Sequence, residues 1–156
     1  MKVWQYLLGG LAVIVIAVQF VPNELPPVIE ENSGDLILTG LADEEISGIL
    51  KTSCYDCHSN QTHYPWYSYV APFSWLVAKD TREGREEANF SNWADYEMMD
   101  QLAILDDLYT EVEEEHMPMP IYTLIHTDAK LDAEQRQKIM EWAEATMDLI
   151  AESEEE

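Results

Sequence analysis

The sequence predicts an all-α protein, in which a helical domain follows an apolar N-terminal helix. Several stretches place apolar residues three and four positions apart, as helices do. No stretch shows the strict apolar and polar alternation of a half-buried strand, and there is no hairpin signal or internal repeat. The 156 residues are enough for one domain with its own core and attached segments.

The N-terminal segment is predicted to be a membrane anchor. From Val3 to Val21 the chain is apolar over 19 residues apart from two glutamines, and Pro22 follows. A helix needs roughly 17–25 such residues to cross a bilayer. Without a small-x-small cleavage site or a lipid-accepting cysteine after it, we expect residues 1–21 to be an uncleaved transmembrane helix. Lys2 precedes the run and acidic residues follow it, so the rest of the chain is expected outside the cytoplasm.

The remaining chain divides into a tether, a domain and a tail. Residues 22–40 contain three prolines with Asn, Ser and Gly, which is typical of an extended tether without a core of its own. The folded domain is expected over residues 41–151. Residues 152–156 form an acidic tail.

Four helices are expected in the domain, over about 42–53, 72–87 and 95–115, and from an N-cap near Asp132 onward. Gly48 lies inside the first and costs about 1 kcal/mol in helix propensity, which indicates close approach by another helix. The predicted faces comprise Ile46, Ile49, Leu50 and Ser53 in the first helix, Met98, Leu102, Leu105, Tyr109 and Val112 in the third, and Ile139, Trp142, Ala143, Thr146, Leu149 and Ile150, which face inward, in the last.

Both cysteines of the chain lie in the run Cys54-Tyr55-Asp56-Cys57-His58. This Cys-x-x-Cys-His spacing is that of covalent c-type haem attachment, in which two thiols add to the porphyrin vinyl groups and the histidine ligates the iron. A disulfide or a thioredoxin-type redox pair is the rival interpretation, but no βαβ pattern surrounds the motif. A zinc site would need a second Cys or His pair at ligand spacing. The motif therefore predicts one covalent haem c, with His58 as the proximal metal ligand.

The Met-Pro-Met-Pro run at 117–120 contains the main candidates for a second axial ligand. Each proline disfavours the α region for the residue before it, so both thioethers are expected on stiff, extended backbone. Such a loop could hold a weak thioether ligand at bonding distance, although its methionines could also only cover the core. We predict Met117 as the second metal ligand, with Met119 as its competitor. His116 or His126 would instead give a bis-histidine site.

Two further groups could contact a porphyrin. The aromatic and proline-rich run at 63–72 could form an apolar wall or simply fill the core. Lys79, Arg82 and Arg85 form the main basic cluster of the chain. Ordinary surface pairing is the default for them, and pairing with haem propionates is the alternative.

Taken together, these motifs resemble the small bacterial haem-binding domain family, whose members are often membrane-anchored. The resemblance spans about residues 45–145. The motifs that carry it are Ser53 to Asn60, Tyr64-Pro-Trp-Tyr67, Pro72-x-Ser-Trp75, Asn89-Phe-Ser-x-Trp93, Met117-Pro118, Tyr122-x-x-x-His126, Ala129-x-Leu131 and Trp142. The resemblance implies a cytochrome c-like helical domain with Cys54 and Cys57 as attachment points and His58 as proximal ligand. It also places the family's Met-Pro position on Met117, whereas Met119 is a departure that adds a second thioether.

The expected protein is a membrane-tethered monohaem c-type cytochrome in a bacterial inner membrane, with its C-terminal domain in the periplasm. It would transfer single electrons and would be a carrier, not an enzyme. A peroxidase-like or gas-sensing domain with an open sixth site is the alternative, and a haem that only stabilises an assembly subunit is a third reading.

The charge of the chain bears on its partners. It has 31 acidic and 8 basic residues, a formal net charge of -23, which disfavours nucleic acid and favours redox partner proteins with a basic docking face. Solvated helix faces alone would also account for the acidic excess.

Overall fold

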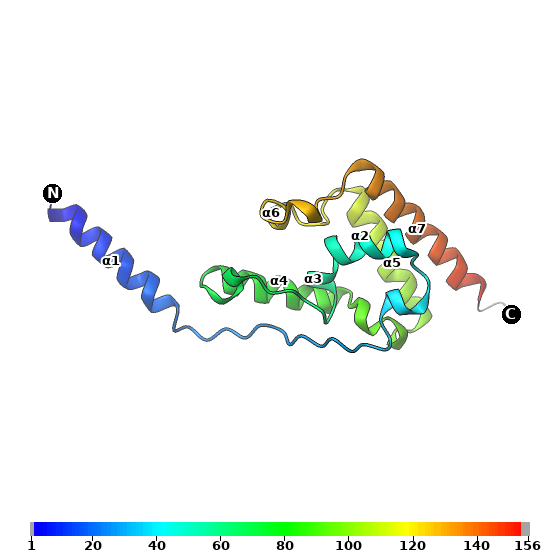
Figure 1. Ribbon diagram of the computed structural model, residues 1–156, viewed down its shortest axis with the longest axis horizontal. Helices are drawn as coiled ribbons and strands as arrows, with labels where there is room; N and C mark the ends of the chain where they lie inside the picture. Colours follow the sequence, from blue (N-terminus) through cyan, green and yellow to red (C-terminus); the bar gives the residue numbers. More distant parts are fainter. Residues whose placement is uncertain (1, 154–156) are drawn as a thin grey trace.

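The structure is a computed structural model that describes residues 2–153. This part of the chain contains helices and no strand, so the predicted all-α class is confirmed (Figure 1). The α-helices are α1 (Lys2–Val18), α2 (Glu44–Ser53), α3 (Tyr55–His58), α4 (Phe73–Glu87), α5 (Met98–Glu113), α6 (Pro120–Thr123) and α7 (Ala133–Glu152). The 3-10 helices are η1 (Leu36–Thr39), η2 (Trp66–Tyr69), η3 (Phe90–Asp95) and η4 (Thr127–Ala129).

Two α-helices, α2 and α7, start at aspartates that cap them. Asp43 accepts a hydrogen bond from the Ile46 backbone N–H at 2.8 Å and starts α2. Asp132 starts α7 with a capping box, in which the Asp132 side chain and the Gln135 side chain each accept from the other residue's backbone N–H. The N-cap predicted at Asp132 is therefore confirmed.

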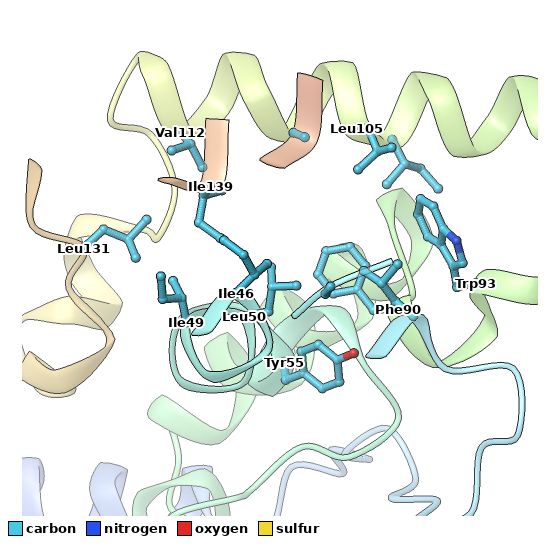
Figure 2. Close-up of a cluster of buried hydrophobic side chains, with 14 of the residues drawn as sticks. Ile46, Ile49, Leu50, Tyr55, Phe90, Trp93, Leu105, Val112, Leu131 and Ile139 are labelled. Carbon is cyan, nitrogen blue, oxygen red and sulfur yellow. The ribbon is translucent and has the colours of Figure 1, made fainter. Parts of the chain in front are cut away.

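The core lies between α2, α5 and α7, with η3 closing one side (Figure 2). Leu50, Leu105 and Ile139 are fully buried and come from these three helices, and Trp93 of η3 is also buried. Burial of a side chain of this size contributes about 1.5–3 kcal/mol. The predicted inward face of α7 is confirmed at Ile139, Ala143, Thr146 and Ile150, whereas Leu149 is exposed and its prediction was wrong.

The close helix approach predicted at Gly48 was wrong, because a Cβ atom built there would meet nothing within 4 Å. The close approach is at Gly84 of α4. A Cβ atom on Gly84 would lie 2.9 Å from the backbone carbonyl oxygen of Cys57 and 3.2 Å from the Cys57 Cβ. Only glycine therefore lets α4 lie directly against α3.

The N-terminal helix α1 is apolar and exposed on all sides, and it packs against no other helix along its length (Figure 1). Within residues 2–153, no helix has both the length and the apolar character that a bilayer span requires. The chain just after α1 is attached to the domain. The Gln19 side-chain amide donates to the Ala71 carbonyl and accepts from the Ala71 N–H, both at 3.0 Å.

Residues 22–40 differ from the expected tether, because hydrogen bonds hold them along the domain. The Ile29 N–H donates to the carbonyl of Asn60 at 2.8 Å, and Tyr64 donates its hydroxyl proton to the Pro26 carbonyl at 2.9 Å. Leu36 is fully buried in the core, and the buried Asp35 accepts a hydrogen bond from the Tyr55 hydroxyl. The core therefore begins before residue 41, since Leu36 belongs to it.

Candidate functional site

The Cys-x-x-Cys-His motif forms a single turn at the junction of α2 and α3. The Cys54 carbonyl accepts from the backbone N–H groups of both Cys57 (3.1 Å) and His58 (2.9 Å), which holds the three side chains on one turn. No disulfide joins the cysteines. Burial raises the pKa of each thiol to about 12, so both are neutral at physiological pH. A thioredoxin-type pair needs a lowered thiol pKa, and this environment does the opposite.

The His58 ring is positioned by a backbone carbonyl. Its Nδ1 lies 3.1 Å from the carbonyl oxygen of Ala88, which can only accept, so Nδ1 carries the proton. Nε2 is then left with a lone pair, as a metal-ligating imidazole requires. Burial lowers the pKa of His58 and keeps the ring neutral. The Phe90 ring lies 5.9 Å away between centroids and limits tilting of the imidazole.

An apolar cavity lies beside the motif, between α3 and α4 on one side and residues 119–126, which we call the α6 segment, on the other. Cys57 lines it, whereas Cys54 and His58 are not among its lining residues. The aromatic and aliphatic side chains in its wall are Tyr64, Tyr67, Phe73, Leu76, Val77, Ile121, Tyr122 and Ile125. Within the aromatic and proline-rich run at 63–72, Tyr64 and Tyr67 line this cavity. A mostly apolar space next to the Cys57 thiol suits a porphyrin.

The candidates for the second axial position separate in space. Met119 and His126 line the cavity, whereas Met117 and His116 do not. Met117 is half-buried in the turn after α5, where its backbone N–H donates to the Glu111 carbonyl at 3.1 Å. His116 is exposed beside acidic side chains of the same turn. The fold therefore brings Met119 and His126 to the cavity next to the motif.

Sequence reasoning missed a polar cluster that joins the α6 segment to the motif. The hydroxyl of Tyr67 hydrogen-bonds Nε2 of His126, and the His126 ring stacks on Tyr122 at 4.3 Å with an interplanar angle of 13°. Tyr122 also donates its hydroxyl proton to Asp56 at 2.7 Å. Burial and the bond to Asp56 raise the pKa of Tyr122, so this proton is retained. The four-residue spacing of Tyr122 and His126 was a usable signal, because residues at this spacing can lie on one turn, and the His126 backbone N–H does donate to the Tyr122 carbonyl at 3.0 Å.

The residues of the basic cluster differ in their burial: Lys79 is exposed, whereas Arg85 is half-buried. Lys79 pairs with Glu83 at the surface. Arg85 donates to the Pro27 carbonyl (2.8 Å) and to the Thr62 hydroxyl (2.9 Å), but its buried Nε has no hydrogen-bond partner within the described residues. Arg85 is half-buried, and its guanidinium, which hydrogen-bonds the cavity residue Thr62, could use this Nε to bind an anionic group.

The residues present fit a haem. They offer two neutral thiols, an oriented imidazole with a free nitrogen, an apolar cavity and an arginine with one N–H unpaired within residues 2–153, and they define a haem-binding protein. The comparison with known families agrees: the family model of the haem-binding domain matches residues 13–145. The chain therefore belongs to the haem-binding domain family, and the resemblance found in the sequence is confirmed. No curated protein and no solved structure matches the chain.

Proposed function

We propose that this haem protein is a membrane-tethered monohaem c-type cytochrome that transfers single electrons outside the cytoplasmic membrane. One observation carries the proposal: Cys54, Cys57 and His58 share a single turn, and the Nδ1 hydrogen bond to Ala88 leaves the imidazole Nε2 free. A bound haem would supply an iron that gains and loses one electron without bond rearrangement.

The residues around the cavity have separate roles in this function. Ala88 fixes the tautomer and ring plane of His58, which keeps the proximal ligand in place in both oxidation states. The apolar side chains of the cavity wall would pack on a bound porphyrin and reduce its contact with water, which would limit the solvent reorganisation that accompanies electron transfer. Gly84 lets α4 approach the motif and close the wall next to Cys57.

For the sixth position we propose Met119 in preference to the Met117 expected from the sequence. Support comes from the position of Met119 in the cavity wall, directly before Pro120, which begins α6. The Met119 backbone (φ -51°, ψ 132°) lies outside the α region, as expected for a residue that precedes proline. A thioether ligand would raise the reduction potential relative to a bis-histidine site.

A second function is favoured by the polar cluster. His126 hydrogen-bonds Tyr67 at the cavity wall and could handle protons there, as a peroxidase-like or gas-sensing domain with an open sixth site would require. The two functions predict different spin states of the iron and different rates of carbon monoxide binding. A carrier should be low-spin and slow to bind carbon monoxide, whereas an open site should be high-spin and bind it at once.

The membrane tether is supported by α1, which is apolar and exposed on every side. Its 17 residues extend about 26 Å at the helical rise, and the apolar run continues beyond it to Val21. A surface of this kind is costly to leave in water, and a lipid environment would take it up. The haem domain would then lie in the periplasm.

The decisive experiment measures how haem is held. Wild-type protein purified from membranes should keep its haem through acid-acetone extraction and on a denaturing gel. Cys54→Ser and Cys57→Ser should each weaken haem retention, and the double variant should abolish it. Met99→Ala, which changes an exposed methionine far from the motif in sequence, is the control and should retain haem fully. Extraction of haem from the wild-type chain would refute covalent attachment while leaving haem binding intact.

A further inference from the structure

The domain has an exposed aromatic surface next to the end of α1, which we call the aromatic edge. It consists of Trp66, Tyr69, Val70 and Phe73. We propose that the aromatic edge rests in the headgroup boundary of the membrane that takes up α1, so that the domain lies on the lipid surface in one orientation. This inference rests on the proposed membrane association of α1.

The side chains of the aromatic edge have the chemistry of a lipid interface. Trp66 and Tyr69 are 76% and 67% exposed, and Phe73 is 55% exposed. Residues three apart in a 3-10 helix eclipse each other, so Trp66 and Tyr69 share one face of η2. Trp and Tyr are enriched at the membrane–water boundary because their rings are amphipathic. Large exposed aromatic groups on a monomer indicate a surface that something apolar covers.

Hydrogen bonds fix the aromatic edge beside the end of α1. Gln19, one residue beyond α1, makes two hydrogen bonds with the backbone of Ala71, at 3.0 Å each. Asn23 donates to the Ser74 carbonyl at 2.8 Å. A groove between these segments is lined by residues of both, including Tyr69. If α1 lies in lipid, the residues on either side of Ala71 must lie at the lipid surface.

The charge distribution favours a lipid surface as the occupant. Residues 59–78 contain no Asp, Glu, Lys or Arg, although the chain carries 31 acidic and 8 basic residues. Residues 3–23 are equally free of charge. These two uncharged segments are the ones joined through Gln19 and Ala71. A basic protein partner would find no carboxylate on this stretch, whereas the interfacial region of a zwitterionic bilayer needs none.

The position of the haem cavity follows from this orientation. Phe73 belongs to the aromatic edge and also lines the cavity, as does Leu76 one turn further along α4. The cavity wall formed by α4 would therefore lie close to the lipid surface. The strongly acidic helix α5 would lie at the other end of the domain, away from anionic headgroups (Figure 1).

The test uses the full haem-loaded chain labelled with 5-fluorotryptophan in phosphatidylcholine nanodiscs. Fluorine spectra are compared with and without a lipid that carries a nitroxide near the headgroup end of its acyl chain. Single Trp→Phe variants assign the resonances. Trp4 reports on α1, Trp66 on the aromatic edge, and Trp142 of α7 is the internal control. We expect the nitroxide to remove the signals of Trp4 and Trp66 and to leave that of Trp142 unchanged.

The outcomes separate this inference from the proposed tether. Loss of the Trp4 signal with an unchanged Trp66 signal would overturn the inference and leave α1 in the membrane, and the aromatic edge would then face a soluble partner. Loss of neither signal would overturn both. As a matched pair, Tyr69→Ser should reduce the broadening of Trp66 at least twofold, whereas Leu149→Ser, which changes an exposed side chain of α7, should not. Equal broadening of Trp66 in both variants would show that Tyr69 makes no lipid contact.

Discussion

Replacing Gly84 by Ala tests whether the contact between α4 and α3 supports the attachment site. The added Cβ would lie 2.9 Å from the Cys57 carbonyl oxygen and 3.2 Å from the carbonyl carbon, and backbone atoms cannot rotate away as a flexible side chain can. Overpacking of this kind costs about 1–3 kcal/mol. Alanine also gains about 1 kcal/mol over glycine in a helix interior, which masks part of that cost.

Gly48→Ala is the matched control, because it gains the same helix propensity at a position where the new Cβ meets nothing within 4 Å. The free energies of unfolding of the two variants should therefore differ by the overpacking cost alone, about 1–3 kcal/mol. With a urea m-value of about 2 kcal/mol/M, their unfolding midpoints should differ by about 0.5–1.5 M. We also expect less covalent haem per chain in Gly84→Ala. Coincident midpoints and equal haem content would refute the assigned role of Gly84.

Three further predictions concern the ligand, the α6 segment and the thiols. Met119→Ala should lower the reduction potential and let carbon monoxide bind the ferrous protein, whereas Met117→Ala should change both properties less. Potentiometry measures the potential, and optical spectra measure carbon monoxide binding. Larger effects in Met117→Ala than in Met119→Ala would identify Met117 as the ligand. Tyr122→Phe should destabilise the protein by about 1–2 kcal/mol and increase amide hydrogen exchange in α6, because its bond to a carboxylate is lost; unchanged exchange would contradict this. In the haem-free protein, Cys54 and Cys57 should react slowly with iodoacetamide at neutral pH. The contribution of the two buried, neutral thiols to the free energy of unfolding should be fully present below the unfolded pKa of 9.0. It should be lost as pH rises toward about 12, because only the unfolded chain releases these protons in that window. Rapid alkylation of the folded protein would contradict this, because it would show accessible thiolates.

Local sequence signals predicted the features that depend on neighbouring residues. The start of α7 at Asp132 follows from its capping chemistry, and the inward positions Leu105 and Val112 follow from helical spacing. The Cys-x-x-Cys-His run predicted a haem site without any knowledge of the fold, and the family match confirms haem binding.

Features that depend on contacts between distant residues could not be predicted from local sequence signals. Gly48 and Gly84 are both glycines inside helices, and only the packing of α4 on α3 distinguishes the crowded one from the open one. The cavity joins residues as far apart as Asp56 and His126, which periodicity cannot bring together. Burial of Leu36 was missed because the proline-rich segment before it suggested a chain without core contacts.

The hydrogen-bonded path of residues 22–40 has a consequence for how electrons could reach this protein. A flexible linker of 19 residues would spread its ends over about 24 Å and let the domain sample many orientations. Here Tyr64 and Asn60 hydrogen-bond the backbone of Pro26 and Ile29 and hold it against the domain. The segment therefore acts as a rigid connection and not as a flexible linker. If the protein transfers electrons as proposed, a haem held in this way could not travel between a donor and an acceptor. Both partners would have to come to one stationary site, and the rate of exchange would depend on their diffusion along or toward the membrane.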